Sequence, residues 1–265
     1  MSARRSFIVF SDLDGTLLDH ETYDFDAARP ALARLRAEGH RLILASSKTA
    51  AEVAPIRQAV GFPDCPAIVE NGAGILPPEH EAGDEPVASG HQRLMCTLDA
   101  LPSELRRHFT GFSDWSAEEV AARTGLSMEA AARARRRAFS EPGLWNGTEE
   151  GYADFCAALK ENGVTVQKGG RFATLSFGGT KGARVDELVA RYRTEDEALV
   201  SVALGDAPND VAMLQNVDIG IVIPNPAHAG LAPFAPVEGG VIRWARLPGP
   251  EGWNEEILAL LNALE

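Results

Sequence analysis

The chain has 265 residues and a formal net charge of −13, and 45% of its residues are hydrophobic. This composition is ordinary for a globular protein, and the length allows one large domain or two smaller ones. The negative charge argues against nucleic acids and anionic membranes as partners, although a bound cation would still let a local site accept a small anionic substrate.

The first predicted element is a buried strand that begins at Ser6 and ends in two carboxylates. Its apolar run is typical of a parallel strand covered on both faces, and open α/β sheets place their chemistry at the carboxyl ends of such strands. We therefore expect Asp12 and Asp14 at the mouth of a site, where their mutual repulsion favours a bound cation such as Mg²⁺. Gly15 allows an immediate turn and Thr16 offers a hydrogen bond, while the alternative is an ordinary acidic turn.

The next stretch alternates between predicted helices and strands. The second strand delivers Ser46-Ser47-Lys48-Thr49 at its carboxyl end, and the third delivers Glu70-Asn71-Gly72. This alternation predicts a doubly wound parallel sheet, an α/β fold with a Rossmann-like core. The predicted elements are a helix over 24–39, a strand over 41–45, a helix over 52–60 and a strand over 67–69.

A different pattern interrupts the alternation after the third strand. An exposed connection rich in Pro, Gly and acidic residues leads into helices and short strands of α+β type. We interpret residues 83–179 as an inserted cap domain, so that residues 1–82 and 180–265 form the α/β core. The predicted elements of the cap are helices opened by Ser116, Ser127 and Thr148, and a hairpin of 164–168 with 171–177.

The α/β alternation resumes at Lys181, which opens a helix. The strand that follows ends in Gly205-Asp206-Ala207-Pro208-Asn209-Asp210, so a second acidic segment comes directly after a buried strand. Because the carboxyl ends of parallel strands share one edge of the sheet, this segment is expected beside Asp12. The predicted elements are a helix over 181–192, a strand over 199–204, a helix over 211–214, a strand over 219–223 and a helix over 253–264.

Four segments in this order resemble the motifs of the haloacid dehalogenase superfamily of phosphohydrolases. Asp12-Leu13-Asp14-Gly15-Thr16 is similar to its first motif, Asp-x-Asp-Gly-Thr, and Gly205 to Asp210 is similar to its fourth, Gly-Asp-x-x-Asn-Asp. Ser46 stands where the second motif has a hydroxyl, and Lys181 where the third has a lysine. Taken alone, Ser46 is also a good helix cap, and Lys181 a good solvated surface residue.

The resemblance implies a role for each of these groups. Asp12 would be the nucleophile that takes up a phosphoryl group, and Asp14 the general acid and base. Ser46 would hydrogen-bond a phosphoryl oxygen, and Lys181 would neutralise the phosphoryl group and keep Asp12 ionised. The implied cofactor is Mg²⁺, and its implied ligands are Asp12, Asp14, Asp206 and Asp210.

The position of the cap and its local motifs resemble one branch of this superfamily. The insertion lies between the second and third motifs, and its stretches from Gly111 to Ser116 and from Phe139 to Pro142 are similar to those of the mannosyl-3-phosphoglycerate phosphatase family. Two positions depart from the family pattern. Thr174 replaces a His in Arg-Phe-x-His, which bears on the sugar that is accepted, and Thr180 replaces the Asp before Lys181.

This resemblance implies a substrate that carries a phosphate, a carboxylate and a sugar. Cationic side chains suit the anionic groups, and the fork of Arg171 can pair bidentately with a carboxylate. Glu70 and Asn71 are expected to bind sugar hydroxyls, although Asn71-Gly72 is also an ordinary turn and Lys168 an ordinary solvated strand residue. The expected substrate-binding residues are Ser47, Lys48, Glu70, Asn71, Gly72, Lys168, Arg171 and Asn209.

We therefore expect a Mg²⁺-dependent phosphatase that acts on a small phosphorylated sugar–glycerate and belongs to mannosylglycerate biosynthesis. The alternatives are a phosphatase for glucosyl-3-phosphoglycerate or another sugar phosphate, a phosphomutase, and an inactive binding protein. Three scattered cysteines, the lack of an apolar signal segment and the lack of a membrane-length apolar run favour a cytoplasmic protein. No catalytic role is indicated for His20, His40, His80, His91, His108 or His228.

Overall fold

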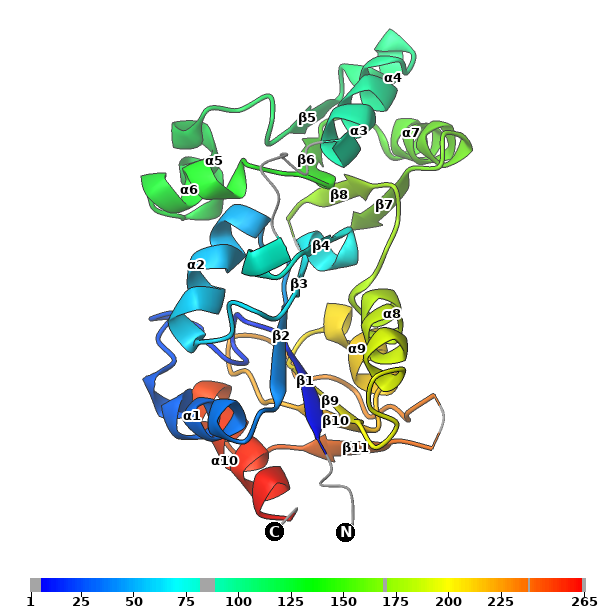
Figure 1. Cartoon of the computed structure of the whole chain (residues 1–265). Helices are drawn as coiled ribbons and strands as arrows, with labels where there is room; N and C mark the ends of the chain where they lie inside the picture. Colours follow the sequence, from blue (N-terminus) through cyan, green and yellow to red (C-terminus); the bar gives the residue numbers. More distant parts are fainter. Residues whose placement is uncertain (1–5, 82–88, 169–170, 238, 264–265) are drawn as a thin grey trace. The chain divides into compact units, whose positions relative to one another are not determined.

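The computed structural model describes residues 6–81, 89–168, 171–237 and 239–263 (Figure 1). The chain divides into two compact units. The first, the core unit, consists of residues 1–46, 54–82 and 180–265, and the second, the inserted unit, of residues 47–53 and 83–179. Residues 47–53 thus group with the insertion, although the segments on both sides of them belong to the core unit.

In the described part of the core unit, seven strands form one sheet in the order β11-β10-β9-β1-β2-β3-β4. Neighbouring strands are parallel except for β3 and β4, which are antiparallel. This sheet confirms the predicted α/β class. Its strands are β1 (Phe7–Ser11), β2 (Arg41–Ala45), β3 (Ala67–Val69), β4 (Gly74–Leu76), β9 (Val200–Gly205), β10 (Ile219–Val222) and β11 (Val241–Trp244).

Helices cover both faces of this sheet (Figure 1). Successive side chains of β1 point to opposite faces, and Ile8 and Phe10 pack in one buried cluster with Val185 and Met213 from two of the helices. On the other face Trp253 is fully buried and donates from Nε1 to Oγ of Ser11 at 3.0 Å. Burial on both sides explains why the strands read as continuous apolar runs. The helices are α1 (Arg29–Ala37), α2 (Ala50–Val60), α8 (Lys181–Arg193), α9 (Val211–Gln215) and α10 (Gly249–Asn262).

Two edge strands of the sheet, β4 and β11, were not predicted from the sequence. β4 has only three residues, and β11 exposes Val241 and Trp244, so neither shows the apolar run of a buried strand. The last helix begins at Gly249, earlier than predicted, because Pro250 fits its first turn. Residue 264 and half of the predicted connection over 77–90, residues 82–88, lie outside the described residues.

The inserted unit contains an antiparallel sheet, in the order β5-β6-β8-β7. The predicted hairpin is present as β7 and β8, with residues 169–170 at its turn outside the described part, and the capping box at Ser116 and Glu119 is formed. The strands are β5 (Phe109–Gly111), β6 (Ser140–Trp145), β7 (Thr165–Lys168) and β8 (Ala173–Ser176). The helices are α3 (Ser89–Asp99), α4 (Ser103–Arg106), α5 (Ala117–Thr124), α6 (Met128–Ala134) and α7 (Glu149–Glu161).

The predicted elements agree with the structure most closely where the apolar pattern is strong. The predicted bounds of β2 and β3 are those observed, while α1 is shorter than predicted because the turn η1 (Asp26–Ala28) precedes it. Short turns of the same kind are η2 (Glu70–Gly72), η3 (Glu79–Glu81) and η4 (Pro208–Asp210). Across the residues that the structure describes, no helix combines the length and the apolar character needed to cross a membrane.

Candidate active site

The sheet brings the predicted polar segments together at one edge. Ser11, the last residue of β1, lies opposite Leu44 of β2 and Leu204 of β9, so the residues that follow each strand emerge side by side. The backbone amide of Asp12 donates to the carbonyl of Leu204 at 2.9 Å. The amide of Ser46 likewise donates to the carbonyl of Ile68 in β3 at 2.9 Å. Strand register therefore sets the first positions of the site.

Three carboxylates gather at this edge, and one ammonium group binds two of them. Asp12, Asp206 and Asp210 each offer an oxygen within 4.8 Å of the others, and all three are buried. Lys181, whose side chain is 1% exposed, donates from Nζ to Oδ1 of Asp12 and, at 2.7 Å, to Oδ1 of Asp210. The first turn of α8 thus places a cation between the segments that follow β1 and β9.

The charges of this cluster are not balanced. Burial, together with repulsion from Asp210 and Asp206, raises the pKa of Asp12 well above its usual value of 3.8, although Lys181 opposes the rise. Burial alone would lower the pKa of Lys181, but the carboxylates of Asp12 and Asp210 outweigh burial and raise it. Three buried carboxylates with one ammonium leave an excess of negative charge. Oxygen donors with this excess fit a hard divalent cation.

Asp210 uses both carboxylate oxygens to build the turn that follows β9. Oδ1 accepts from Lys181, and Oδ2 accepts from the backbone amides of Asp206 at 3.2 Å and Ala207 at 3.1 Å. A Cβ on Gly205 would lie 2.5 Å from the Cβ of Asp210, so only glycine leaves room for this arrangement. Asp210 therefore fixes the positions of Asp206 and Lys181 as well as adding charge.

Asp206 is held by three further side chains. Thr16 donates from Oγ1 to its Oδ1 at 2.9 Å, and Asn225 donates from Nδ2 to its Oδ2 at 2.8 Å. Nε2 of His228 lies 2.9 Å from the same Oδ2. The hydrogen bond between the ring and the carbonyl of Ala229 raises the pKa of His228 above its usual value, and Asp206 adds to this effect while burial opposes it.

Asn225 and His228 are functional neighbours that the sequence analysis missed. They follow β10, whose last residue, Val222, lies opposite Gly205 in the parallel sheet. The amide of Ile223 also donates to the carbonyl of Gly205 at 2.9 Å. The signal was present in the sequence, because a polar segment after β10 must emerge beside the residues that follow β9.

Asp14 occupies a different position from the other predicted metal ligands. It lies in a tight turn, where the amide of Gly15 donates to the carbonyl of Leu18 at 2.9 Å, and its side chain is half-buried. Among the described residues, Asp14 is not part of the carboxylate cluster. Gly15 has a φ of +80°, and a Cβ there would lie 2.1 Å from Nδ2 of Asn225. The glycine therefore lets the first motif pass close to Asn225.

The third strand ends in a turn that connects several site segments. Asn71 accepts from Nδ2 of Asn209 at 3.1 Å through its side chain, and Gly72 accepts from Nε of Arg184 at 3.0 Å through its carbonyl. Glu70 is almost fully buried. The expected sugar-binding residues of this turn thus contact the segment after β9 and the first turns of α8.

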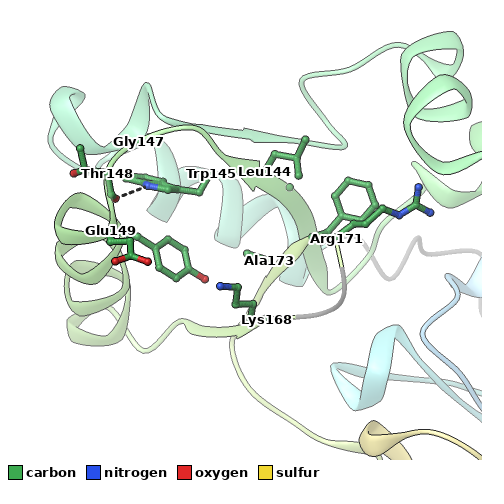
Figure 2. A pocket seen from close by; sticks show the side chains of 11 residues that line it. Leu144, Trp145, Gly147, Thr148, Glu149, Lys168, Arg171 and Ala173 are labelled. Carbon is green, nitrogen blue, oxygen red and sulfur yellow. Dashed lines mark hydrogen bonds between the residues drawn. The ribbon is translucent and has the colours of Figure 1, made fainter. Parts of the chain in front are cut away.

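The predicted cap residues lie in the inserted unit. Lys168 lines a pocket of about 220 Å³ between the β7–β8 hairpin and the start of α7 (Figure 2). Figure 2 shows its side chain directed into this pocket and the guanidinium of Arg171 directed away from it. Arg171 donates to the carbonyls of Arg123 at 2.7 Å and Thr124 at 3.2 Å, so it caps the end of α5.

Ser47 and Lys48 lie in the short segment that groups with the inserted unit. Ser47 is exposed and Lys48 is half-buried. The next residue, Thr49, is fully buried and donates from Oγ1 to the carbonyl of Arg133 at 3.1 Å. This hydrogen bond joins the segment to the end of α6.

Comparisons with known proteins agree with this geometry. The profile of the haloacid dehalogenase-like hydrolase family matches residues 9–91 and 145–232. A glucosyl-3-phosphoglycerate/mannosyl-3-phosphoglycerate phosphatase from Persephonella marina is 34% identical to this chain. The alignment covers 97% of this chain and 98% of the relative. The protein of the same name from Methanococcoides burtonii is also 34% identical, with 97% of its length and 96% of this chain covered.

Solved structures show the same fold at lower identity. A haloalkanoate-superfamily phosphatase from Bacteroides thetaiotaomicron has a TM-score of 0.66 and 17% identity, with 100% of this chain and 97% of that chain covered. The sucrose-phosphatase from Synechocystis, solved with sucrose and phosphate, has a TM-score of 0.55 and 16% identity, with 98% of both chains covered. At these identities the likeness shows the arrangement of the chain, not its substrate.

Proposed function

Because the chain belongs to the haloacid dehalogenase-like hydrolase family and is a phosphoric monoester hydrolase, we propose that it is a Mg²⁺-dependent phosphatase for mannosyl-3-phosphoglycerate. The products are mannosylglycerate and inorganic phosphate. The observation that carries the proposal is the ion pair of buried Lys181 with Asp12 and Asp210, beside Asp206. This arrangement gives a nucleophile, a fixed cation and a set of oxygen donors at one strand edge.

The proposed reaction has two steps. A carboxylate oxygen of Asp12 attacks the phosphorus, the bond from phosphorus to the ester oxygen breaks, and Asp14 gives its proton to the leaving oxygen. Water then gives a proton to Asp14 and attacks the phosphorus, and the bond to Asp12 breaks to release phosphate. Lys181 offsets the phosphoryl charge, and Ser46, at the end of β2, is proposed to hydrogen-bond a phosphoryl oxygen.

The buried carboxylates are the proposed Mg²⁺ site. Asp12, Asp206 and Asp210 supply the oxygens that this ion prefers, and the pKa of Asp12 is raised by burial and by the neighbouring carboxylates, whose charge a cation would offset. Bound there, the ion would supply charge neutralisation for the nucleophile and the phosphoryl group. Asp14 remains a proposed ligand, although its carboxylate is not part of the cluster among the described residues.

Asn225→Ala is expected to lower Mg²⁺ affinity about 10- to 100-fold, because it removes a donor that orients Asp206. The Oδ1 of Asn225 accepts from the amide of Ala227 at 2.9 Å, which fixes its Nδ2 toward Asp206. Isothermal titration of Mg²⁺ into the purified protein measures this effect. Asn216→Ala, which removes an exposed amide bonded to Asp186, is the matched control. Equal affinities in both variants would contradict this role for Asn225.

The pocket of Figure 2 supports a role of the inserted unit in sugar recognition. Trp145 and Tyr152 give apolar faces, and Lys168 and Glu149 give polar groups, a combination typical of small-molecule sites. Arg171 is a weaker candidate because its guanidinium already binds two backbone carbonyls. We propose that Lys168 binds the organic part of the substrate. Ser47, Lys48 and Asn209 remain proposed substrate contacts.

Lys168→Ala is expected to raise KM for mannosyl-3-phosphoglycerate about tenfold with little change in kcat, since it removes a charge-assisted contact away from the reacting atoms. Turnover of a small aryl phosphate, which lacks the sugar and the carboxylate, should not change. Lys160→Ala on the exposed side of α7 serves as the control. A fall in kcat on both substrates would show that Lys168 acts on the reaction itself.

The proposed function is tested by phosphate release from a substrate panel with and without Mg²⁺. The panel contains mannosyl- and glucosyl-3-phosphoglycerate, 3-phosphoglycerate, hexose phosphates and an aryl phosphate. The names of both relatives include glucosyl-3-phosphoglycerate, so this ester is the second candidate substrate. Preference for the mannosyl ester would support the proposal, and preference for simple hexose phosphates, or activity unchanged by a chelator, would contradict it.

A further inference from the structure

The turn η2 has a backbone that ordinary residues avoid. Glu70, Asn71 and Gly72 have φ values of +52°, +59° and +92°, so three consecutive residues are left-handed and only the last is glycine. This conformation is unfavourable for L-residues with a side chain. Such a conformation persists only where the surrounding structure determines it. The contacts of the turn show what determines it here.

The turn contacts three of the segments that form the site. The amide of Asn71 donates to the carbonyl of Ser46 at 2.9 Å, and its side chain accepts from Asn209 at 3.1 Å. A Cβ on Gly72 would lie 2.2 Å from the carbonyl carbon of Thr180 and 2.6 Å from the amide nitrogen of Lys181. One turn thus joins the segments after β2 and β9 to the first residue of α8.

The contact with α8 fixes the base of the Lys181 side chain. Arg184, one turn further along the helix, donates from Nε to the carbonyl of Gly72 at 3.0 Å. The helix start is therefore held at two points, by backbone packing at Thr180 and by this hydrogen bond. Movement of the turn would move the backbone of Lys181 and, with it, the ammonium that binds Asp12 and Asp210.

We infer that Glu70–Gly72 is a strained positioning turn that sets Lys181 against Asp12, rather than a site for sugar hydroxyls. Its residues are positioning residues, because they act through Lys181, Ser46 and Asn209. The inference rests on the proposed phosphatase reaction. It predicts that changes in the turn lower kcat and leave substrate binding nearly unchanged.

The first test compares Gly72→Ala with Gly39→Ala. Both residues have a strongly positive φ, but a Cβ on Gly39 meets nothing within 4 Å. Gly72→Ala is expected to lower kcat about 100-fold with a nearly unchanged KM, since small displacements of catalytic groups cost this much. Gly39→Ala, with comparable backbone strain and no clash, should keep wild-type kinetics. Equal kinetics in the two variants, or a loss confined to KM, would overturn the inference.

A second pair of variants keeps the test decisive if Gly72→Ala does not fold. Asn71→Gly relieves the left-handed strain but removes the acceptor for Asn209, and Asn71→Asp keeps the acceptor. We expect Asn71→Gly to have a Tm no lower than wild type and a kcat about tenfold lower, the effect of one lost hydrogen bond, with activity retained in Asn71→Asp. A lower Tm with unchanged kcat would show a merely structural turn. An inactive wild type would instead overturn the proposed function.

Discussion

Asp12→Asn is expected to abolish phosphate release and, at the same time, to raise the thermal stability of the metal-free protein. Activity should fall at least about 10⁴-fold, because an amide cannot replace the carboxylate as nucleophile. Stability should rise because the substitution removes one of three crowded negative charges, while the amide oxygen can still accept from Lys181. A Tm increase of about 2–4 °C corresponds to roughly 1 kcal/mol for a chain of this size.

The sign of the stability change follows from the pKa of Asp12. This pKa is raised above 3.8 in the folded protein, so the folded state holds a proton that the unfolded state releases. Metal-free stability therefore falls as pH rises from 3.8 through the folded pKa, and the gain from Asp12→Asn should be largest above that range. Melting curves recorded in the presence of a chelator at several pH values measure the gain in Tm of Asp12→Asn over wild type. The control is Asp154→Asn on the exposed face of α7. A lower Tm in Asp12→Asn at neutral pH would contradict the charge argument.

Lys181→Met is expected to lose both activity and stability. Methionine has a similar length but leaves the carboxylates of Asp12 and Asp210 without their shared cation. Removal of one partner from a buried ion pair costs about 3–5 kcal/mol, and loss of a charge that stabilises the transferring phosphoryl group should lower kcat about 10²- to 10³-fold. Mg²⁺ should raise the Tm of this variant more than that of wild type, because a divalent cation offsets part of the negative charge that the lost ammonium no longer balances.

The control for Lys181→Met is Lys160→Met, which removes an exposed lysine from α7. The double variant Asp12→Asn/Lys181→Met gives a sharper test. Because it removes one charge of each sign from a contacting pair, its loss of stability should be smaller than that of Lys181→Met alone. An unchanged Tm in Lys181→Met without metal would show that the ammonium does not compensate the carboxylates.

The sequence predicted the parts of the site that are fixed by strand position. Asp12, Ser46 and Asp206 each follow an apolar run, and a parallel sheet brings the ends of such runs to one edge. Lys181 was predicted in the site only because it resembles a residue of the third motif. The hydrophobic pattern of the sequence does not indicate that this lysine is buried. The structure adds its two carboxylate partners.

The parts that the sequence did not predict depend on contacts between distant segments. His228 was given no role, but the loop after β10 brings it to Asp206. Arg171 was expected to bind a carboxylate; the sequence did not indicate that its guanidinium also caps α5, where free carbonyls at a helix end attract it. The left-handed backbone at Glu70 also has no sequence signal, since glutamate gives no preference for it.

The pairing of β1 also constrains the order in which the chain folds. One neighbour of β1 is β2, which is synthesised soon afterwards, but the other, β9, ends at residue 205, after the whole insertion. At about 5–20 residues per second, a ribosome needs roughly 8–32 s between the end of β2 and the end of β9. The inserted unit has its own buried clusters and its strands are adjacent in sequence, so it can fold while one edge of β1 still waits unpaired. The pairing of the central strand that leads to Asp12 can therefore be completed only after the whole inserted unit has been synthesised.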